Sequence, residues 1–146
     1  MSTKYRNEPC PTCGAFTNRG VTIDAVIVKD GKILLIKRGV EPFKGYWGLV
    51  GGYVGWDETV EDAVRRELKE ELGLDATSLR FIKLYSNPDR HPKQSIDMAY
   101  AVEVTGDPRP GDDAVDFHWH PIDALPDELA FDHKQIIADY CAFMQI

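Results

Sequence analysis

The sequence has 146 residues, of which 43% are hydrophobic and 28% charged, and its formal net charge at pH 7 is −7. Length and composition predict a globular protein with a substantial core, and the negative charge argues against a nucleic-acid polymer as partner. No apolar run is long enough for a membrane-spanning helix and the N-terminus lacks a secretory signal, so we expect a cytoplasmic protein with no membrane contact.

Residues 1–19 form a polar segment that contains Cys10-Pro-Thr-Cys13-Gly. This CPxCG pattern is half of a zinc knuckle and supplies two thiolate ligands, whereas a closed structural site needs two more. The other candidate ligands do not have a paired knuckle spacing; they are Cys141, His91, His118, His120 and His133. We therefore expect a reduced cysteine pair here, with zinc at Cys10 and Cys13 as the alternative.

From residue 20 onward the pattern indicates mixed α and β structure. Six segments have the β-branched content or the alternation of strands: residues 21–28, 33–37, 47–54, 79–86, 96–104 and 114–120. Helices are predicted over residues 58–72 and 133–143, the second capped by Asp132. The fold class expected for residues 20–146 is therefore α+β, with a mixed β-sheet sandwiched between helices.

The predicted helix over residues 58–72 carries carboxylates on its apolar face. At 100° per residue, its apolar arc is formed by Val60, Ala63, Val64 and Leu68. Glu67 and Glu71 fall in the middle of this arc and Glu70 at its edge, whereas Arg65 and Lys69 face the opposite side. A core helix would have Leu or Ile at the positions of Glu67 and Glu71.

Glu67 and Glu71 lie one helical turn apart, where like charges destabilise an isolated helix by about 0.2–0.5 kcal/mol. A cation between them removes this repulsion, and carboxylates converging from one helix suit a hard divalent ion such as Mg²⁺ or Mn²⁺. The alternative is a charged helix that is exposed on all sides.

Residues 52–74 resemble the Nudix box, G-x5-E-x7-R-E-U-x-E-E-x-G-U, at every specified position. The strand, turn and strand before the box, followed by Gly45-Tyr-Trp-Gly-Leu-Val-Gly-Gly52, extend the resemblance over roughly residues 20–140. The sequence departs from the family where Val50 replaces the usual Pro. The resemblance implies the Nudix fold, an α/β/α sandwich, and a pyrophosphohydrolase.

The resemblance also implies a role for each box residue. It assigns the divalent ions to four groups: the carboxylates of Glu67, Glu70 and Glu71 and the backbone carbonyl of Gly52. Arg66 would orient Glu70, and Glu58 would hold the loop by pairing with Arg66. For the general base we rank Glu70 or Glu67 first and Asp113, on a later loop, second.

Substrate contacts are expected outside the box. Aromatic side chains could stack on a nucleobase, and the candidates are Trp47, Tyr46, Tyr85 and Phe131. Arg90 lies in Ser-Asn-Pro-Asp-Arg-His-Pro, which resembles the equivalent loop of the ADP-ribose pyrophosphatases of the family. A surface-loop arginine is the alternative for Arg90, and packing in the core is the alternative for each aromatic residue.

The resemblance thus predicts metal-dependent hydrolysis of the pyrophosphate linkage of a small nucleoside diphosphate derivative, with ADP-ribose giving AMP and ribose 5-phosphate. One alternative is a nucleoside triphosphate pyrophosphatase that cleanses the nucleotide pool. Another is a non-catalytic sensor that binds ADP-ribose. The sequence leaves the oligomeric state open, a homodimer included.

Overall fold

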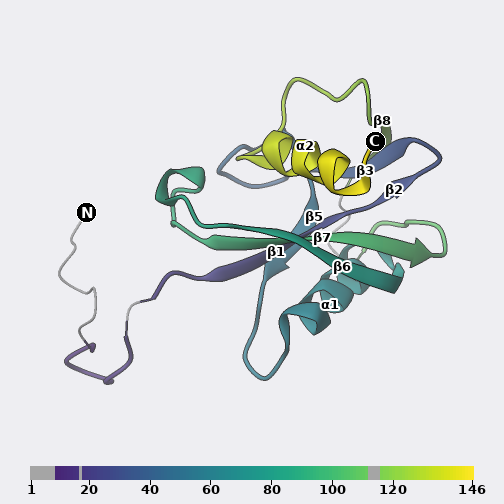
Figure 1. Ribbon diagram of the computed structural model, residues 1–146. Coiled ribbons are helices and arrows are strands. Elements are labelled where there is room, and N and C mark those ends of the chain that lie inside the picture. The colour runs from purple at the N-terminus through teal and green to yellow at the C-terminus, as the bar shows by residue number, and fades with distance from the viewer. Residues whose placement is uncertain (1–8, 17, 112–115) are drawn as a thin grey trace.

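The strands form two sheets, and the two helices lie on opposite sides of the first sheet (Figure 1). The structure, a computed structural model, describes residues 9–16, 18–111 and 116–146. Among the helices of these residues, none combines the length and apolarity that crossing a bilayer requires. The expected α+β sandwich is confirmed.

The first sheet has the strand order β5-β1-β7-β6. Its strands are β5 (Val50–Tyr53), β1 (Val21–Val26), β7 (Ile96–Thr105) and β6 (Asp75–Tyr85). β1 pairs with β7 in parallel, whereas the pairings of β5 with β1 and of β6 with β7 are antiparallel. The sheet is therefore mixed, as predicted.

The second sheet is built around β3, which pairs with three short strands. Its strands are β2 (Val28–Lys29), β3 (Lys32–Lys37), β4 (Trp47–Gly48) and β8 (Phe117–Pro121). Two segments predicted as single strands are thus each divided between the sheets: residues 21–28 into β1 and β2, and residues 47–54 into β4 and β5. Each crossing point carries a buried apolar residue, Ile27 or Leu49, which fixes the position at which the chain changes sheet.

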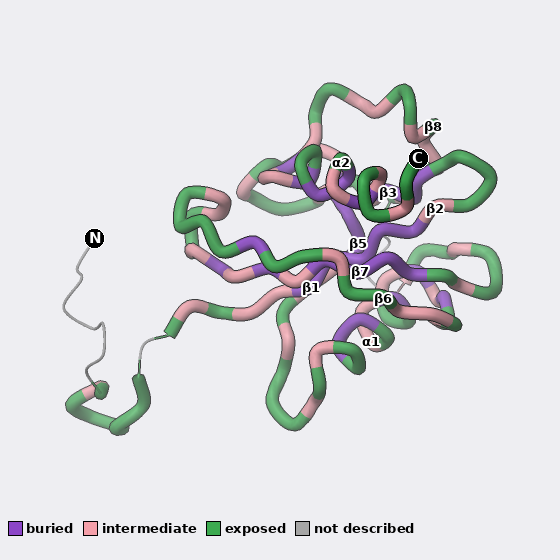
Figure 2. The backbone as a smooth tube through the Cα atoms, viewed as in Figure 1, coloured by how far each residue is buried: buried purple, intermediate pink, exposed green. Residues whose placement is uncertain are grey.

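Buried apolar residues form one cluster on each face of the first sheet. Figure 2 shows buried positions along its strands and on both helices. On one face α1 (Val60–Leu72) packs through four fully buried residues, Ala63, Val64, Leu68 and Leu72. On the other face α2 (His133–Met144) packs through Ile136, Ile137 and Tyr140. The 3-10 helix η1 (Pro88–Arg90) lies in the loop between β6 and β7.

The boundaries of α1 follow from its caps. Its N-cap is Thr59, whose side chain accepts a hydrogen bond from the backbone N–H of Asp62 at 3.0 Å, so the helix begins two residues later than the predicted residue 58. The predicted end at residue 72 is confirmed, and the following Gly73 adopts the left-handed conformation, with φ 67°, that such a cap favours. These caps fix which residues of α1 face β5.

Candidate active site

The face of α1 that packs on the sheet brings Glu67 and Glu71 toward the interior. The Glu67 side chain is 13% exposed, whereas that of Glu70 is 60% exposed. Gly52 of β5 lies directly against the Glu67 carboxylate, so a Cβ at this position would overlap it. The strand therefore lies close to the Glu67 carboxylate, and a larger residue at position 52 would displace that side chain.

Arg66 connects the acidic residues of the box. Its guanidinium donates two hydrogen bonds of 2.9 Å to Glu58, one from Nε and one from Nη2. Its Nη1 donates to Glu67 at 2.9 Å and to Glu70 at 3.2 Å, and its Nη2 also reaches the carbonyl oxygen of Tyr53 at 3.0 Å. The structure thus places Arg66 beside both predicted partners, Glu58 and Glu70, and additionally beside Glu67.

Glu58 also anchors the loop before α1, where its Oε2 accepts a hydrogen bond of 2.6 Å from the backbone N–H of Gly55. The hydrogen bonds from Arg66, followed by the one from Gly55, lower the pKa of Glu58 to about 2. The same loop holds Trp56, whose side chain is 97% exposed. Glu58 is therefore ionised at neutral pH and holds this loop in place.

The carboxyl of Glu71 is not balanced by any described neighbour. Its Oε2 is buried and has no hydrogen-bond partner among the described residues. Burial, together with the charge of Glu67, raises the pKa of Glu71 to about 9. Burial also raises the pKa of Glu67, although Arg66 opposes this shift. A positive charge beside Glu71 would stabilise its carboxylate form and lower its pKa again.

The oxygen donors of α1 and β5 fit a hard divalent cation in kind, because Glu71 Oε2 is unpartnered and Gly52 leaves room beside Glu67. As the side chains lie, no three His, Cys, Asp or Glu residues of the described ranges are grouped closely enough to hold an ion. Arg66 pairs with two of the acidic residues, Glu67 and Glu70.

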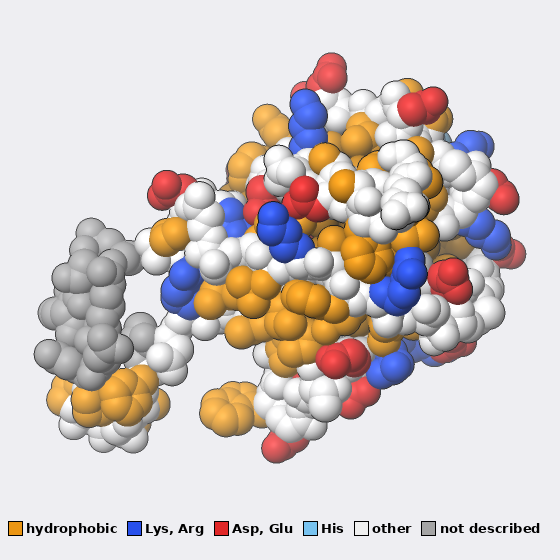
Figure 3. Space-filling view, viewed as in Figure 1, with side chains coloured by type: hydrophobic (Ala, Val, Ile, Leu, Met, Phe, Trp, Pro, Cys, Tyr) orange, Lys and Arg blue, Asp and Glu red, His pale blue; other side chains and the backbone are white. Residues whose placement is uncertain are grey.

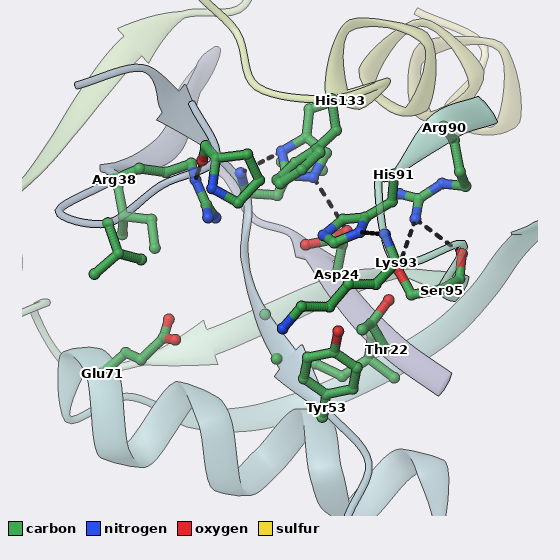
Figure 4. A pocket seen from close by; sticks show the side chains of 18 of the residues that line it. Thr22, Asp24, Arg38, Tyr53, Glu71, Arg90, His91, Lys93, Ser95 and His133 are labelled. Atoms are coloured by element: carbon green, nitrogen blue, oxygen red, sulfur yellow. Dashed lines mark hydrogen bonds and ion pairs between the residues drawn. The ribbon is translucent and has the colours of Figure 1, made fainter. Parts of the chain in front are cut away.

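A cavity of about 340 Å³ opens beside Glu71. It extends over β1 and β5 toward the loop between β6 and β7 and the start of α2 (Figure 4). Two of its lining residues, Arg38 and Lys93, are cations that the sequence did not single out. Arg38 Nε donates to the carbonyl oxygen of Pro42 at 2.8 Å, and its guanidinium lies 4.8 Å from the centre of the Phe131 ring. The Lys93 side chain forms no hydrogen bond or ion pair with the described residues.

Arg90 lines the same cavity, but its guanidinium is bound by the protein. The side chain is 4% exposed, and it donates two hydrogen bonds of 2.8 Å to Asp132, from Nε and Nη2. Its Nη1 donates to the backbone oxygen of Ser95 at 3.2 Å. Asp132 occupies the N-cap position of α2 as predicted, yet its side chain makes no capping hydrogen bond because it binds Arg90 instead. Arg90 thereby ties the loop after β6 to the start of α2.

The floor of the cavity contains buried polar residues that were not predicted. His133 Nδ1 accepts a hydrogen bond of 3.0 Å from the Leu49 backbone N–H, which leaves Nε2, 3.3 Å from Asp24 Oδ2, as the donor. Burial lowers the pKa of His133 to about 4, so the ring is neutral at pH 7. Asp97 Oδ1 accepts from Thr22 Oγ1 at 2.7 Å. Burial raises the pKa of Asp24 to about 7 and that of Asp97 well above its ordinary value.

The remaining predicted substrate residues are distributed differently. Trp47 is not among the cavity-lining residues, because β4 pairs with β3 and the indole packs against His120, 4.8 Å between ring centres. A direct contact between Trp47 and substrate is therefore not supported by its position. Phe131 does line the cavity, but its ring is stacked on His91 at 4.6 Å. Asp113, the second candidate for the base, lies outside the described residues.

Comparison with known proteins gives a consistent result. A family model described as the NUDIX domain matches residues 18–140. The chain is 45% identical over 127 residues to an ADP-ribose pyrophosphatase of Methanocaldococcus jannaschii, covering 86% of this chain and 75% of that protein. It is 35% identical over 129 residues to an NAD-capped RNA hydrolase, NudC, of Chromobacterium violaceum, where the match covers 86% of this chain but 48% of that protein.

Two solved structures share the fold over most of the chain. A MutT NUDIX hydrolase from Burkholderia pseudomallei has a TM-score of 0.77 and 33% sequence identity, covering 84% of this chain and 98% of that one. The NUDIX domain of Shewanella oneidensis NrtR, solved with ADP ribose, has a TM-score of 0.79 and 28% identity, covering 99% of both chains.

The fold and the box define a hydrolase of phosphorus anhydrides, and the chain belongs to the Nudix family. Within that family it is a pyrophosphohydrolase that resembles the ADP-ribose pyrophosphatases, as predicted.

Proposed function

We propose that this chain hydrolyses ADP-ribose to AMP and ribose 5-phosphate in a reaction that depends on a divalent metal ion. One observation carries the proposal: a single cavity joins the unbalanced carboxyl of Glu71 to the cations Arg38 and Lys93. Hydrolysis of a diphosphate flanked by two sugars needs carboxylates that bind a metal ion at the scissile anhydride. It also needs cationic side chains, here Arg38 and Lys93, that bind the rest of the anionic substrate. The names of the M. jannaschii relative and of the NrtR complex support ADP-ribose.

In this proposal the carboxylates of Glu67, Glu70 and Glu71 and the carbonyl of Gly52 hold Mg²⁺ or Mn²⁺. Such an ion, when bound, neutralises diphosphate oxygens and favours ionisation of water. Arg66 holds Glu67 and Glu70 at short range, and its own pKa is raised chiefly by the hydrogen bonds to Glu58, so it remains a cation throughout. Arg66 is therefore the residue that positions the metal-binding carboxylates.

The protein's remaining task is proton transfer. Water attacks one phosphorus atom, the bond between that phosphorus and the bridging oxygen breaks, and the second phosphate leaves with the bridging oxygen. We assign the proton released by the attacking water to Glu70 or Glu67, with Asp113 as the alternative acceptor. Glu70 is the more exposed of the two box residues and is therefore the more accessible to a water molecule.

At the other end of the cavity, Arg38 and Lys93 are proposed to bind the anionic part of the substrate. Arg90 supports this wall through Asp132 and Ser95. The substrate contact expected for Arg90 thus becomes an indirect one, with Lys93 as the residue that meets the ligand.

The test is product identification after incubation of the protein with ADP-ribose and Mg²⁺ in ¹⁸O-labelled water. We expect AMP and ribose 5-phosphate in equal amounts, with the label in one of the two. Release of pyrophosphate from nucleoside triphosphates at a higher kcat/KM would instead assign the chain to the nucleoside triphosphate pyrophosphatases. Tight binding of ADP-ribose without turnover would indicate a sensor.

A further inference from the structure

The two N-terminal cysteines lie on a short hairpin that the proposed reaction does not use. In this hairpin the Cys10 backbone N–H donates to the Ala15 carbonyl at 2.7 Å, and the Gly14 N–H donates to the Cys10 carbonyl at 2.9 Å. Pro9 and Phe16 form an antiparallel bridge at its base. Gly14, with φ 77°, supplies the left-handed residue that turns the chain back. The segment is therefore an ordered turn with both thiols near its tip.

Both thiols of the turn are accessible to a ligand. Cys13 is exposed and Cys10 is partly exposed. A deprotonated thiol is the form that binds metal. Cys10 and Cys13 are both free thiols. The hairpin thus presents half of a tetrahedral sulfur site.

The other half cannot come from the described part of the same chain. All remaining Cys and His residues are described, and each is held elsewhere: Cys141 in α2, His91 on Phe131, His118 and His120 beside Trp47, and His133 beside Asp24. No three His, Cys, Asp or Glu side chains of the described ranges form a group that could hold a metal. A second copy of the hairpin would supply the two missing thiolates.

The position of the hairpin allows this. It lies apart from the body of the domain, and its side chains form a separate, largely apolar surface (Figure 3). Four apolar residues on it are exposed: Pro9, Pro11, Ala15 and Phe16, the last with 53% of its surface accessible. A second hairpin packed against the first would cover these side chains. A two-fold arrangement of identical surfaces is also the commonest symmetry of protein dimers.

We propose that Cys10 and Cys13 of two copies of this chain bind one Zn²⁺ between them, as four thiolates in a tetrahedral site. Each chain releases two thiol protons on binding, and the sulfur atoms lie about 2.3 Å from the metal. The expected reduced pair at these positions is then the metal-free form of a dimer contact. The site is separate from the carboxylates of α1, so it joins two catalytic domains without contributing to hydrolysis.

The experiment uses the full chain, purified without chelator or metal-affinity resin, with zinc measured by mass spectrometry and molar mass by light scattering. We expect one zinc per two chains and a particle of twice 16.5 kDa. Titration of Zn²⁺ into the reduced, metal-free protein should convert monomer to dimer with an end point at half an equivalent. Co²⁺ in place of Zn²⁺ should give the charge-transfer absorption of a tetrathiolate site.

The variants Cys10→Ser and Cys13→Ser should abolish both zinc binding and the zinc-dependent dimer, with ADP-ribose hydrolysis unchanged. Cys141→Ser is the matched control and should keep both. An end point of one zinc per chain, no zinc uptake by the reduced protein, or a zinc-dependent dimer that persists in Cys10→Ser would each overturn the proposal. Unchanged turnover in the variants also separates its failure from that of the proposed hydrolase function.

Discussion

Buried acidic residues lie at both ends of the cavity, at the floor near Arg90 and His133 and at the end formed by α1. The two groups differ in how many protein partners each carboxyl has. At the floor, Asp132 is paired with Arg90 and Asp24 lies beside His133, and Asp97 accepts a hydrogen bond from Thr22 through Oδ1 while its buried Oδ2 has no partner among the described residues. At the α1 end, Glu71 has an unpartnered buried oxygen, and Arg66 is shared by Glu58, Glu67 and Glu70. The comparison indicates that each acid at the floor has at least one donor from the protein, whereas Glu71 at the α1 end has none among the described residues and is the carboxyl that a ligand would complete.

The largest expected effect tests the α1 end. Glu71→Gln should lower kcat with saturating Mg²⁺ by about a thousandfold, equivalent to about 4 kcal/mol, because it removes the charge that no described residue balances. The melting temperature in EDTA should be unchanged or slightly higher, since a buried carboxyl is removed. Steady-state kinetics and calorimetry measure both. Glu103→Gln, at an exposed position on β7, is the control, and wild-type activity in Glu71→Gln would refute the metal site.

The next effect tests the floor. Arg90→Met should lower the free energy of unfolding by about 3–5 kcal/mol, because it leaves Asp132 without its buried partner. Urea denaturation measures this change, and Arg65→Met, on the exposed face of α1, should have little effect. Adding Asp132→Asn to Arg90→Met should recover part of the loss. A raised KM with unchanged stability would instead show that Arg90 contacts the substrate directly.

A smaller effect is expected at the two cations that line the cavity, Arg38 and Lys93. Lys93→Met should raise KM for ADP-ribose about tenfold with little change in kcat, the result of losing one charge-assisted contact made equally in ground and transition states. Lys134→Met, on the exposed side of α2, is the matched control. A change in kcat alone would place Lys93 nearer to the reacting phosphorus than the cavity geometry implies.

The smallest effect concerns the pH dependence of stability, to which Glu71 and His133 contribute with opposite signs. The pKa of Glu71 is raised from 4.5 to about 9, so the folded, metal-free protein binds more protons and loses stability as pH rises through this window. The pKa of His133 is lowered from 6.5 to about 4, so its contribution is lost as pH falls from 6.5 through 4. Denaturation in EDTA between pH 5 and 9 should show a shallower decline for Glu71→Gln than for wild type, a difference on the order of 1 kcal/mol. Equal slopes would contradict the unbalanced carboxyl.

Sequence reasoning reached the α1 end because its information is local. The positions of Glu67 and Glu71 follow from a period of 3.6 residues, and Gly73 marks the helix end within the same short segment. The floor depends on contacts between distant segments instead. Arg90 and Asp132 are 42 residues apart, and nothing in either neighbourhood identifies the partner. The sequence therefore suggested that Arg90 was available to a substrate, whereas in the fold its guanidinium is bound by Asp132.

The loop before α1 has a practical consequence for spectroscopy. Of the three tryptophans, Trp56 is 97% exposed, whereas Trp47 and Trp119 are partly buried. The backbone beside Trp56 is held to α1 through Glu58, which accepts hydrogen bonds from Gly55 and from Arg66. We expect that a metal ion bound at Glu67 and Glu70, as proposed, changes the contacts of Arg66 and with them the fluorescence emission of Trp56. The proposed metal binding can then be followed in a stopped-flow instrument without a label.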